Sequence, residues 1–172
     1  MTSAPTSAMP HVPSSPDLAG APFPSVEEIL PHRGTMRLID AVLACDEDTL
    51  TARAHVEGDA WYADAEGAMP TWIGIELMAQ AIAAHVGLLA MRAGKPMRPG
   101  VLLGSSRYEA HVPAFARNAP LTINVKALLR SEEGHGAYEC VIQYDGAVGA
   151  EAVIKVFQPR DFQSFIEEGF RS

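Results

Sequence analysis

The chain has 172 residues, which is the length of one domain with room for a sizeable core. Its 21 acidic and 13 basic residues give a net charge of −8 at pH 7, so no basic surface is available to neutralise the phosphates of a nucleic acid. Its two cysteines, Cys45 and Cys140, are too few for a disulfide scaffold or a thiolate metal site.

Two observations bear on the location of the protein. The first basic residue is Arg33, and no continuous apolar segment of a secretory signal precedes it. The longest uncharged apolar stretch, residues 77–91, includes Gln80 and His85 and is too short and too polar for a good membrane span. We therefore expect a cytoplasmic protein that does not insert into a membrane.

Residues 1–24 differ in composition from the rest of the chain. They hold six of the 13 prolines, and alanine, serine and threonine fill most of the remaining positions. Such a segment buries too little apolar surface to offset the entropy lost on ordering. We predict a flexible tail over residues 1–24 and one folded domain over residues 25–172, with an extended arm on a partner as the alternative for the tail.

The first part of the predicted domain combines a short helix with two strands. Ser25-Val-Glu-Glu28 fits a capping box, and Pro31 stops the helix that follows it. Residues 36–45 and 49–56 have the composition of strands, and residues 57–71 read as a long loop.

A long helix is predicted next, over residues 71–93. Gly94 is a natural stop for this helix, and Pro96 lies just beyond it. Large apolar side chains cover every face of the helix rather than one stripe. A helix that is apolar all round is a buried helix, so we expect other elements to surround it.

The remainder of the chain reads mainly as strands. We predict four of them and a last short helix over residues 160–168; the strands cover residues 101–111, 121–131, 137–144 and 147–157. Asp145-Gly146 is a strong hairpin signal between the last two. Strands gathered before and after one central helix favour an α+β architecture. The economical arrangement is a curved antiparallel sheet wrapped around the helix, the hot-dog fold, in which two protomers usually pair as a dimer.

Glu76 stands out because it lies in the first turns of the apolar helix. A carboxylate in such surroundings must be paired or protonated, and Gln80, one turn later on the same face, can hydrogen-bond it. One interpretation is a structural carboxylate near the helix start, where the helix dipole favours an anion. The other is a general acid–base group kept in an apolar interior for catalysis.

Several motifs resemble the β-hydroxyacyl-carrier-protein dehydratases of fatty acid synthesis. Leu30-Pro-His-Arg33 with Met36-Arg-Leu-Ile-Asp40 is similar to the opening of that family. Met69-Pro70 followed by Glu76-Leu-Met-Ala-Gln80 is similar to its central-helix signature. The resemblance covers about residues 25–158 and is closest to a divergent branch associated with aryl polyene pigments and related polyketides.

The chain departs from the fatty-acid enzymes at their catalytic histidine. That histidine precedes the helix carboxylate by 14 residues, a position that Tyr62 occupies here. The resemblance therefore carries over Glu76 as the acid but supplies no loop base. His32 is the best candidate for a replacement, with a structural role as the alternative; weaker candidates are His55, His111 and Asp64.

The resemblance implies dehydration of a 3-hydroxyacyl thioester on acyl carrier protein to the trans-2-enoyl thioester. Glu76 and His32 are then the expected catalytic residues. The expected substrate-binding residues are Gln80, Thr71, Trp72, Tyr62 and Arg107, with backbone N–H groups at Thr71 and Trp72 holding the thioester oxygen and Arg107 meeting the carrier.

No metal or nucleotide cofactor is implied, because the substrate arrives on the phosphopantetheine arm of the carrier. The expected partners are acyl carrier protein and a second hot-dog subunit, in a homodimer or a heterodimer. Two other functions stay open: a non-catalytic subunit that pairs with a complete dehydratase, which the missing loop histidine favours, and an acyl thioesterase in which the helix carboxylate activates water.

Overall fold

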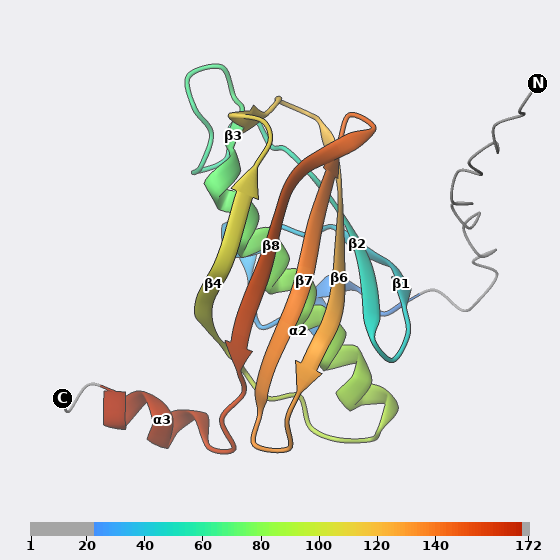
Figure 1. Cartoon of the computed structure of the whole chain (residues 1–172), viewed down its shortest axis with the longest axis vertical. Coiled ribbons are helices and arrows are strands. Elements are labelled where there is room, and N and C mark those ends of the chain that lie inside the picture. Colours follow the sequence, from blue (N-terminus) through green and yellow to red (C-terminus); the bar gives the residue numbers. More distant parts are fainter. Residues whose placement is uncertain (1–22, 170–172) are drawn as a thin grey trace, which may run out of the picture.

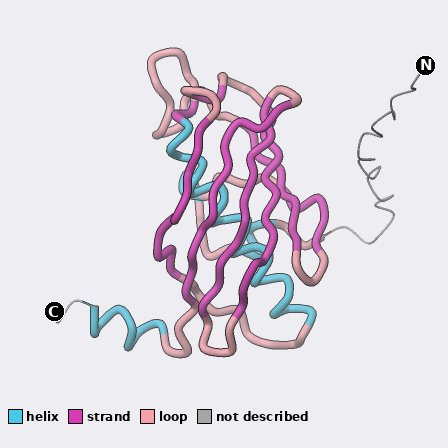
Figure 2. Tube along the Cα trace, in the orientation of Figure 1, coloured by secondary structure: helices cyan, strands magenta, loops and turns pink. Residues whose placement is uncertain are grey.

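The computed structural model describes residues 23–169 of the chain (Figure 1). Almost all of the predicted tail, residues 1–24, lies outside the described residues, as do residues 170–172 of the predicted domain. Within the described part, one curved antiparallel sheet wraps around a single long helix, α2 (Gly74–Arg92) (Figure 2). The predicted α+β hot-dog architecture is confirmed.

The main sheet has six strands in the order β1-β2-β6-β7-β8-β4, and every neighbouring pair is antiparallel. Consecutive strands pair wherever a short turn joins them, and β4 comes from before the β6–β8 meander to complete one edge. The strands are β1 (Ala41–Cys45), β2 (Thr49–His55), β4 (Val101–Ala110), β6 (Pro120–Arg130), β7 (His135–Tyr144) and β8 (Ala147–Phe157). Two short strands that the sequence did not predict, β3 (Met69–Pro70) and β5 (Ala114–Phe115), form a separate ribbon.

The core lies between α2 and the concave face of the sheet. Alternate residues of β2 and β6 point inward, so that Leu50, Ala52 and Ala54 are buried and Thr51 and Arg53 are not. The segment Thr71–Arg92 is long and apolar enough to cross a membrane by length and composition alone, but 61% of its most apolar window is buried inside the fold. Its composition is therefore that of a core helix.

Four shorter helical elements complete the described chain. α1 (Val26–Ile29) and the 3₁₀ turn η1 (Gly34–Met36) precede the sheet, the 3₁₀ turn η2 (Thr71–Ile73) leads into α2, and α3 (Phe162–Gly169) follows β8. At the start of α1, the Ser25 backbone N–H donates to the Glu28 carboxylate at 2.9 Å, as the capping-box pattern predicts. The predicted helix over residues 71–93 begins as η2 and becomes α-helical at Gly74.

The strand predicted to start at residue 36 starts at Ala41 instead. Residues 34–36 form η1, and the polar backbone groups of Met36 and Leu38 bind a side chain of α2 rather than a neighbouring strand. The sequence pattern was apolar enough for a strand, but a backbone that pairs with a helix side chain cannot also join the ladder.

Candidate active site

Glu76 lies in the first turn of α2, where it forms part of the wall of a pocket of about 440 Å³. Its side chain is 34% exposed. The expectation of a carboxylate buried in an apolar interior is therefore only partly met, because the pocket opens the helix surface at this point. Gln80, one turn further along α2, is by contrast completely buried.

Gln80 ties the Glu76 carboxylate to the chain that precedes β1. Its Nε2 donates to Glu76 Oε1 at 2.8 Å and to the Met36 carbonyl at 2.7 Å, while its Oε1 accepts from the Leu38 N–H at 2.8 Å. The Gln80 amide is buried, and its hydrogen bonds go to Glu76, Met36 and Leu38. Gln80 thus orients Glu76, and its expected direct contact with the substrate is not supported.

His32 meets Glu76 from the segment between α1 and η1. The distance from His32 Nε2 to Glu76 Oε1 is 3.4 Å, and the histidine side chain is 29% exposed. The Arg33 guanidinium holds this segment in place by donating to the Leu30 carbonyl and, at 2.9 Å, to the His32 carbonyl. The structure therefore brings together the two residues that the sequence nominates for acid–base chemistry.

The pocket that Glu76 and His32 share is apolar along most of its length. It follows α2 from Glu76 toward the C-terminal half of the helix. The end of α1 lies on one side of it, and the start of β4 and the end of β8 lie on the other. Its volume falls within the range of about 300–1,000 Å³ that is typical of small-molecule sites. The apolar side chains among its lining residues are Ile29, Leu30, Ile82, Val86, Met97, Val101, Leu102, Val156 and Phe157.

Thr71 and Trp72 do not line this pocket. Thr71 is buried, and its N–H donates to the Pro113 carbonyl at 3.4 Å, so that this N–H is already used in joining η2 to the chain before β5. Trp72 is 63% exposed. The expected oxyanion site at the start of the helix is therefore wrong for Thr71, and the Trp72 side chain lies on the surface.

Tyr62, which occupies the position of the family's loop histidine, is also away from the Glu76 pocket. It is buried, and its hydroxyl accepts a hydrogen bond from the Glu57 N–H at 2.9 Å. Burial raises the pKa of this phenol above its usual value of 10.0. Tyr62 lines a separate hollow of about 240 Å³ together with Asp40 and His55, so its expected contact with the substrate is not supported.

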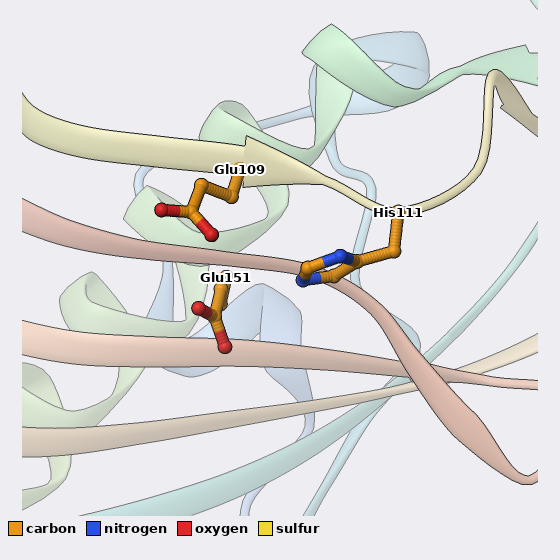
Figure 3. Close-up of side chains that lie close together, drawn as sticks. All are labelled: Glu109, His111 and Glu151. Atoms are coloured by element: carbon orange, nitrogen blue, oxygen red, sulfur yellow. The ribbon is translucent and has the colours of Figure 1, made fainter.

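Arg107 lies on β4 outside the pocket, in a charged cluster on the surface of the sheet. Its guanidinium donates to Glu151 Oε1 at 2.7 Å, and its Nε lies 3.1 Å from Glu109 Oε1. Hydrogen bonding to Glu151 raises the pKa of the arginine above its usual value. Figure 3 shows the two carboxylates beside His111 on the neighbouring strands β4 and β8. The side-chain ligand atoms of these three residues lie within 4.8 Å of one another, but both carboxylates are already paired with Arg107.

The other histidines in the described part of the chain also lie away from the Glu76 carboxylate. His55 is exposed and pairs with Asp40 at 2.7 Å, and His135 stacks on Phe157 with ring centroids 4.6 Å apart. His85 is fully buried on α2, where its Nε2 lies 3.1 Å from the Asp46 carbonyl. The prediction of an interior histidine at position 85 is confirmed, and desolvation lowers its pKa below the usual 6.5.

Asp64, the remaining candidate for the missing base, caps the long loop. Its Oδ1 accepts from the Ala68 N–H at 2.8 Å and from the Glu66 N–H at 3.0 Å. These bonds are those of a structural turn acid. Among the sequence's candidates for a base, His32 alone contacts Glu76 within the described residues.

Part of the pocket was not anticipated from the sequence. Met97 and Arg98 come from the connection between α2 and β4, and Phe157 and Gln158 from the end of β8. Only the proline and glycine content of residues 94–100 signals a connection there, and nothing in it indicates that the segment folds back over the helix. The pairing of Val101 with Phe157 brings the two segments together.

Comparison with known proteins agrees with the fold. One chain of the dehydratase heterocomplex ApeI:P from Xenorhabdus doucetiae is 28% identical, with a TM-score of 0.78 over 84% of this chain and 97% of that one. A hypothetical thioesterase with coenzyme A from Streptococcus pneumoniae (16%, TM-score 0.54, 69% and 86% coverage) and AziG from S. sahachiroi (14%, TM-score 0.55, 72% and 92% coverage) share the fold alone.

The search of curated proteins found no match. A family model described as ApeP-like, ApeP dehydratase, matches residues 24–167, which is nearly all of the described chain and includes both His32 and Glu76. This chain therefore belongs to the ApeP-like dehydratase family.

Proposed function

We propose that the protein dehydrates a 3-hydroxyacyl thioester, carried on acyl carrier protein, to the trans-2-enoyl thioester, with Glu76 and His32 as its acid–base pair. The observation that carries this proposal is the meeting of these two side chains, 3.4 Å apart, at a pocket that is otherwise mostly apolar. Membership of a dehydratase family supports the reaction type. The motif resemblance supports a place in fatty-acid, polyketide or aryl polyene synthesis.

The chemistry needs one base and one acid. In the proposed reaction the neutral His32 imidazole takes the proton from the carbon next to the thioester carbonyl, and the protonated Glu76 carboxyl gives its proton to the departing 3-hydroxyl, which leaves as water. The electron pair of the broken C–H bond becomes the new double bond. Transfer of the proton from His32 to Glu76 then restores both groups, and their separation of 3.4 Å makes that transfer short.

A second hot-dog subunit is the proposed partner. One similar structure is described as a dehydratase heterocomplex, and this chain has a buried tyrosine in place of the loop histidine. Strand β4 lies at one edge of the sheet and pairs with β8 alone among the described strands. It exposes Leu102 and Leu103, and an unpaired edge of ten residues is a ready template for another strand.

The same observations favour the non-catalytic alternative in one respect. A subunit that lacks the loop base could stabilise a complete dehydratase rather than turn over substrate itself. The His32–Glu76 pair favours catalysis, because a merely structural subunit has no need of an imidazole and a carboxylate at an open pocket. The likeness to thioesterases is at the level of the fold and gives no comparable support to hydrolysis.

The carrier is proposed to approach the end of the pocket where Arg33 is exposed, next to His32. Arg33 is better placed than Arg107 to meet the phosphate of the pantetheine arm, because Arg107 lies outside the pocket and its guanidinium is paired with two carboxylates.

The decisive experiment compares four samples with 3-hydroxyacyl thioesters on a carrier protein: the full chain alone, a hot-dog partner alone, the two mixed, and the mixture containing Glu76→Gln. Enoyl product is followed by mass spectrometry and free thiol by a colorimetric reagent. We expect enoyl product from the wild-type mixture and its loss with Glu76→Gln. Equal activity of the partner alone and of both mixtures would assign this chain a structural role, and thiol release without enoyl product would identify a thioesterase.

A further inference from the structure

One face of α2 forms the floor of the pocket. Its small residues Ala79, Ala83 and Gly87 are spaced four residues apart, so they lie one above another, and the larger Ile82 and Val86 line the pocket beside them. The face runs from Glu76 to Gly87, which is about 16 Å at a rise of 1.5 Å per residue. The floor is therefore long, with a row of small residues along it.

The walls of the pocket are bulkier than its floor. Ile29 and Leu30 at the end of α1 form one side, and Val101, Val156 and Phe157 from the sheet form the other. Because α1 runs alongside α2, the segment that carries His32 at one end of the floor also places Ile29 at the other end. The side chains of this pocket are thus polar near Glu76 and His32 and mostly apolar beyond them, where Arg98 and Gln158 are the polar exceptions among the lining residues.

The end of the floor opposite Glu76 is closed by Met97. A Cβ atom built on Gly87 would lie 3.4 Å from Met97 Sδ and 3.1 Å from the Ile29 carbonyl, so the thioether and α1 converge over this glycine. Met97 is 44% exposed and belongs to the connection between α2 and β4. A flexible, unbranched side chain in this position limits the length of the pocket without sealing it rigidly.

We propose that the acyl chain of the substrate lies extended along this face of α2, and that Ala83 and Met97 set its length. The proposal rests on the proposed function, which puts the thioester and its 3-hydroxyl at Glu76 and His32. A floor of about 16 Å accepts an extended chain of roughly ten or more carbon atoms, given C–C bonds near 1.5 Å. Ala83 lies midway, where a larger side chain would cross the path of the chain.

Binding of unreactive ligands tests the length limit separately from turnover. The probes are saturated acyl-pantetheine amides from about six to about fourteen carbons, measured by calorimetry on the full chain, alone and with its hot-dog partner. In the wild type, affinity should rise about fourfold per added methylene until the pocket is filled, and then level off. Turnover of 3-hydroxyacyl thioesters of the same lengths is measured in parallel.

Ala83→Leu should bring that plateau to shorter chains and weaken binding of the longest probes by about fifteenfold, because leucine displaces some two methylene groups. Met97→Ala should move the plateau to longer chains. Ala90→Leu is the matched control, since Ala90 is on the same helix but does not line the pocket, and it should leave the plateau unchanged. Leucine is a good helix former at both positions.

The outcomes separate the two proposals. A plateau that stays in place in Ala83→Leu and Met97→Ala, or affinity that is independent of chain length, overturns the length limit, whatever turnover shows. Length-dependent binding that shifts as described but no turnover in any combination overturns the proposed function and leaves the length limit standing. Absence of binding at every length, with or without the partner, overturns the length limit.

Discussion

The Glu76 carboxylate and the His32 imidazole lie 3.4 Å apart, at a distance longer than the 2.7–2.9 Å of a strong charge-assisted hydrogen bond. The oxygen nearest His32 already accepts a hydrogen bond from Gln80 at 2.8 Å. The buried amide therefore holds the carboxylate in position, and the imidazole is not needed for that purpose. Both groups are left partly exposed at the pocket, where a substrate can reach them from the open side.

Replacing Glu76 by glutamine tests the acid. Glutamine keeps the size of the side chain and still offers an oxygen to the Gln80 amide, so we expect a folded protein. It cannot donate a carboxylic proton to the leaving hydroxyl, and the rate of dehydration should fall on the order of 10²–10⁴-fold. Steady-state kinetics on the active sample measure the loss. Glu109→Gln, a surface change on β4, is the control and should retain activity; a Glu76→Gln enzyme that is equally active would remove Glu76 from the mechanism.

His32→Gln tests the base. Glutamine can still fill the space beside Glu76 but cannot accept a proton at neutral pH, so kcat/KM should fall on the order of 10²–10⁴-fold. The pH profile of kcat/KM should also lose the side that reports the base. His135→Gln is the control, because His135 is the first residue of β7 and is exposed. A wild-type pH profile in His32→Gln would show that the base is elsewhere, as expected if a partner subunit supplies it.

Gln80→Leu should destabilise the fold. The change leaves the Leu38 N–H and the Met36 carbonyl without the side chain that now satisfies them, at about 1–3 kcal/mol for each buried group. We therefore expect a loss of about 2–5 kcal/mol in the free energy of unfolding, measured by urea denaturation. Gln143→Leu on an exposed position of β7 should stay within about 0.5 kcal/mol of the wild type. Equal stabilities for the two variants would contradict a stabilising role for the Gln80 hydrogen bonds to Met36 and Leu38.

Much of the fold could be predicted because local patterns decide it. The alternation of β6 and β8, the Asp145-Gly146 turn and the unbroken apolar character of α2 each report burial directly. The Glu76–Gln80 contact was also predictable, because residues four apart share a helix face. The strands β3 and β5 were not, since two residues each are too short to show any period.

The extent of the pocket was less predictable than the carboxylate within it. How far the pocket extends from Glu76 depends on segments that follow it far along the chain, at Met97 and Phe157, and no local pattern reports where they fold. The errors at Tyr62 and Arg107 have a similar origin. Tyr62 is hydrogen-bonded by the Glu57 N–H, and Arg107 is paired with two carboxylates. Only the tertiary structure brings these partners within reach.

His85 should make the stability of the protein depend on pH. It is fully buried on α2, and desolvation lowers its pKa below 6.5, although the hydrogen bond to the Asp46 carbonyl opposes the shift. The charged groups that act on it are Arg130, which lowers its pKa further, and Asp46 and Asp48, which raise it. Between its folded pKa and 6.5 the unfolded chain binds more protons than the native state, so stability is full above about pH 6.5 and falls as the pH drops below it.

Urea unfolding at about pH 7.5 and about pH 5.5 measures this dependence, whose slope from one group cannot exceed about 1.4 kcal/mol per pH unit. His85→Gln should flatten the slope in this window, because glutamine does not titrate and can still donate to the Asp46 carbonyl. The exposed His111→Gln should leave it as in the wild type. The carboxyl of Asp46, whose pKa the Thr49 hydrogen bonds lower, contributes in a separate window around and below 3.8. A slope that persists in His85→Gln would assign the acid sensitivity to another group.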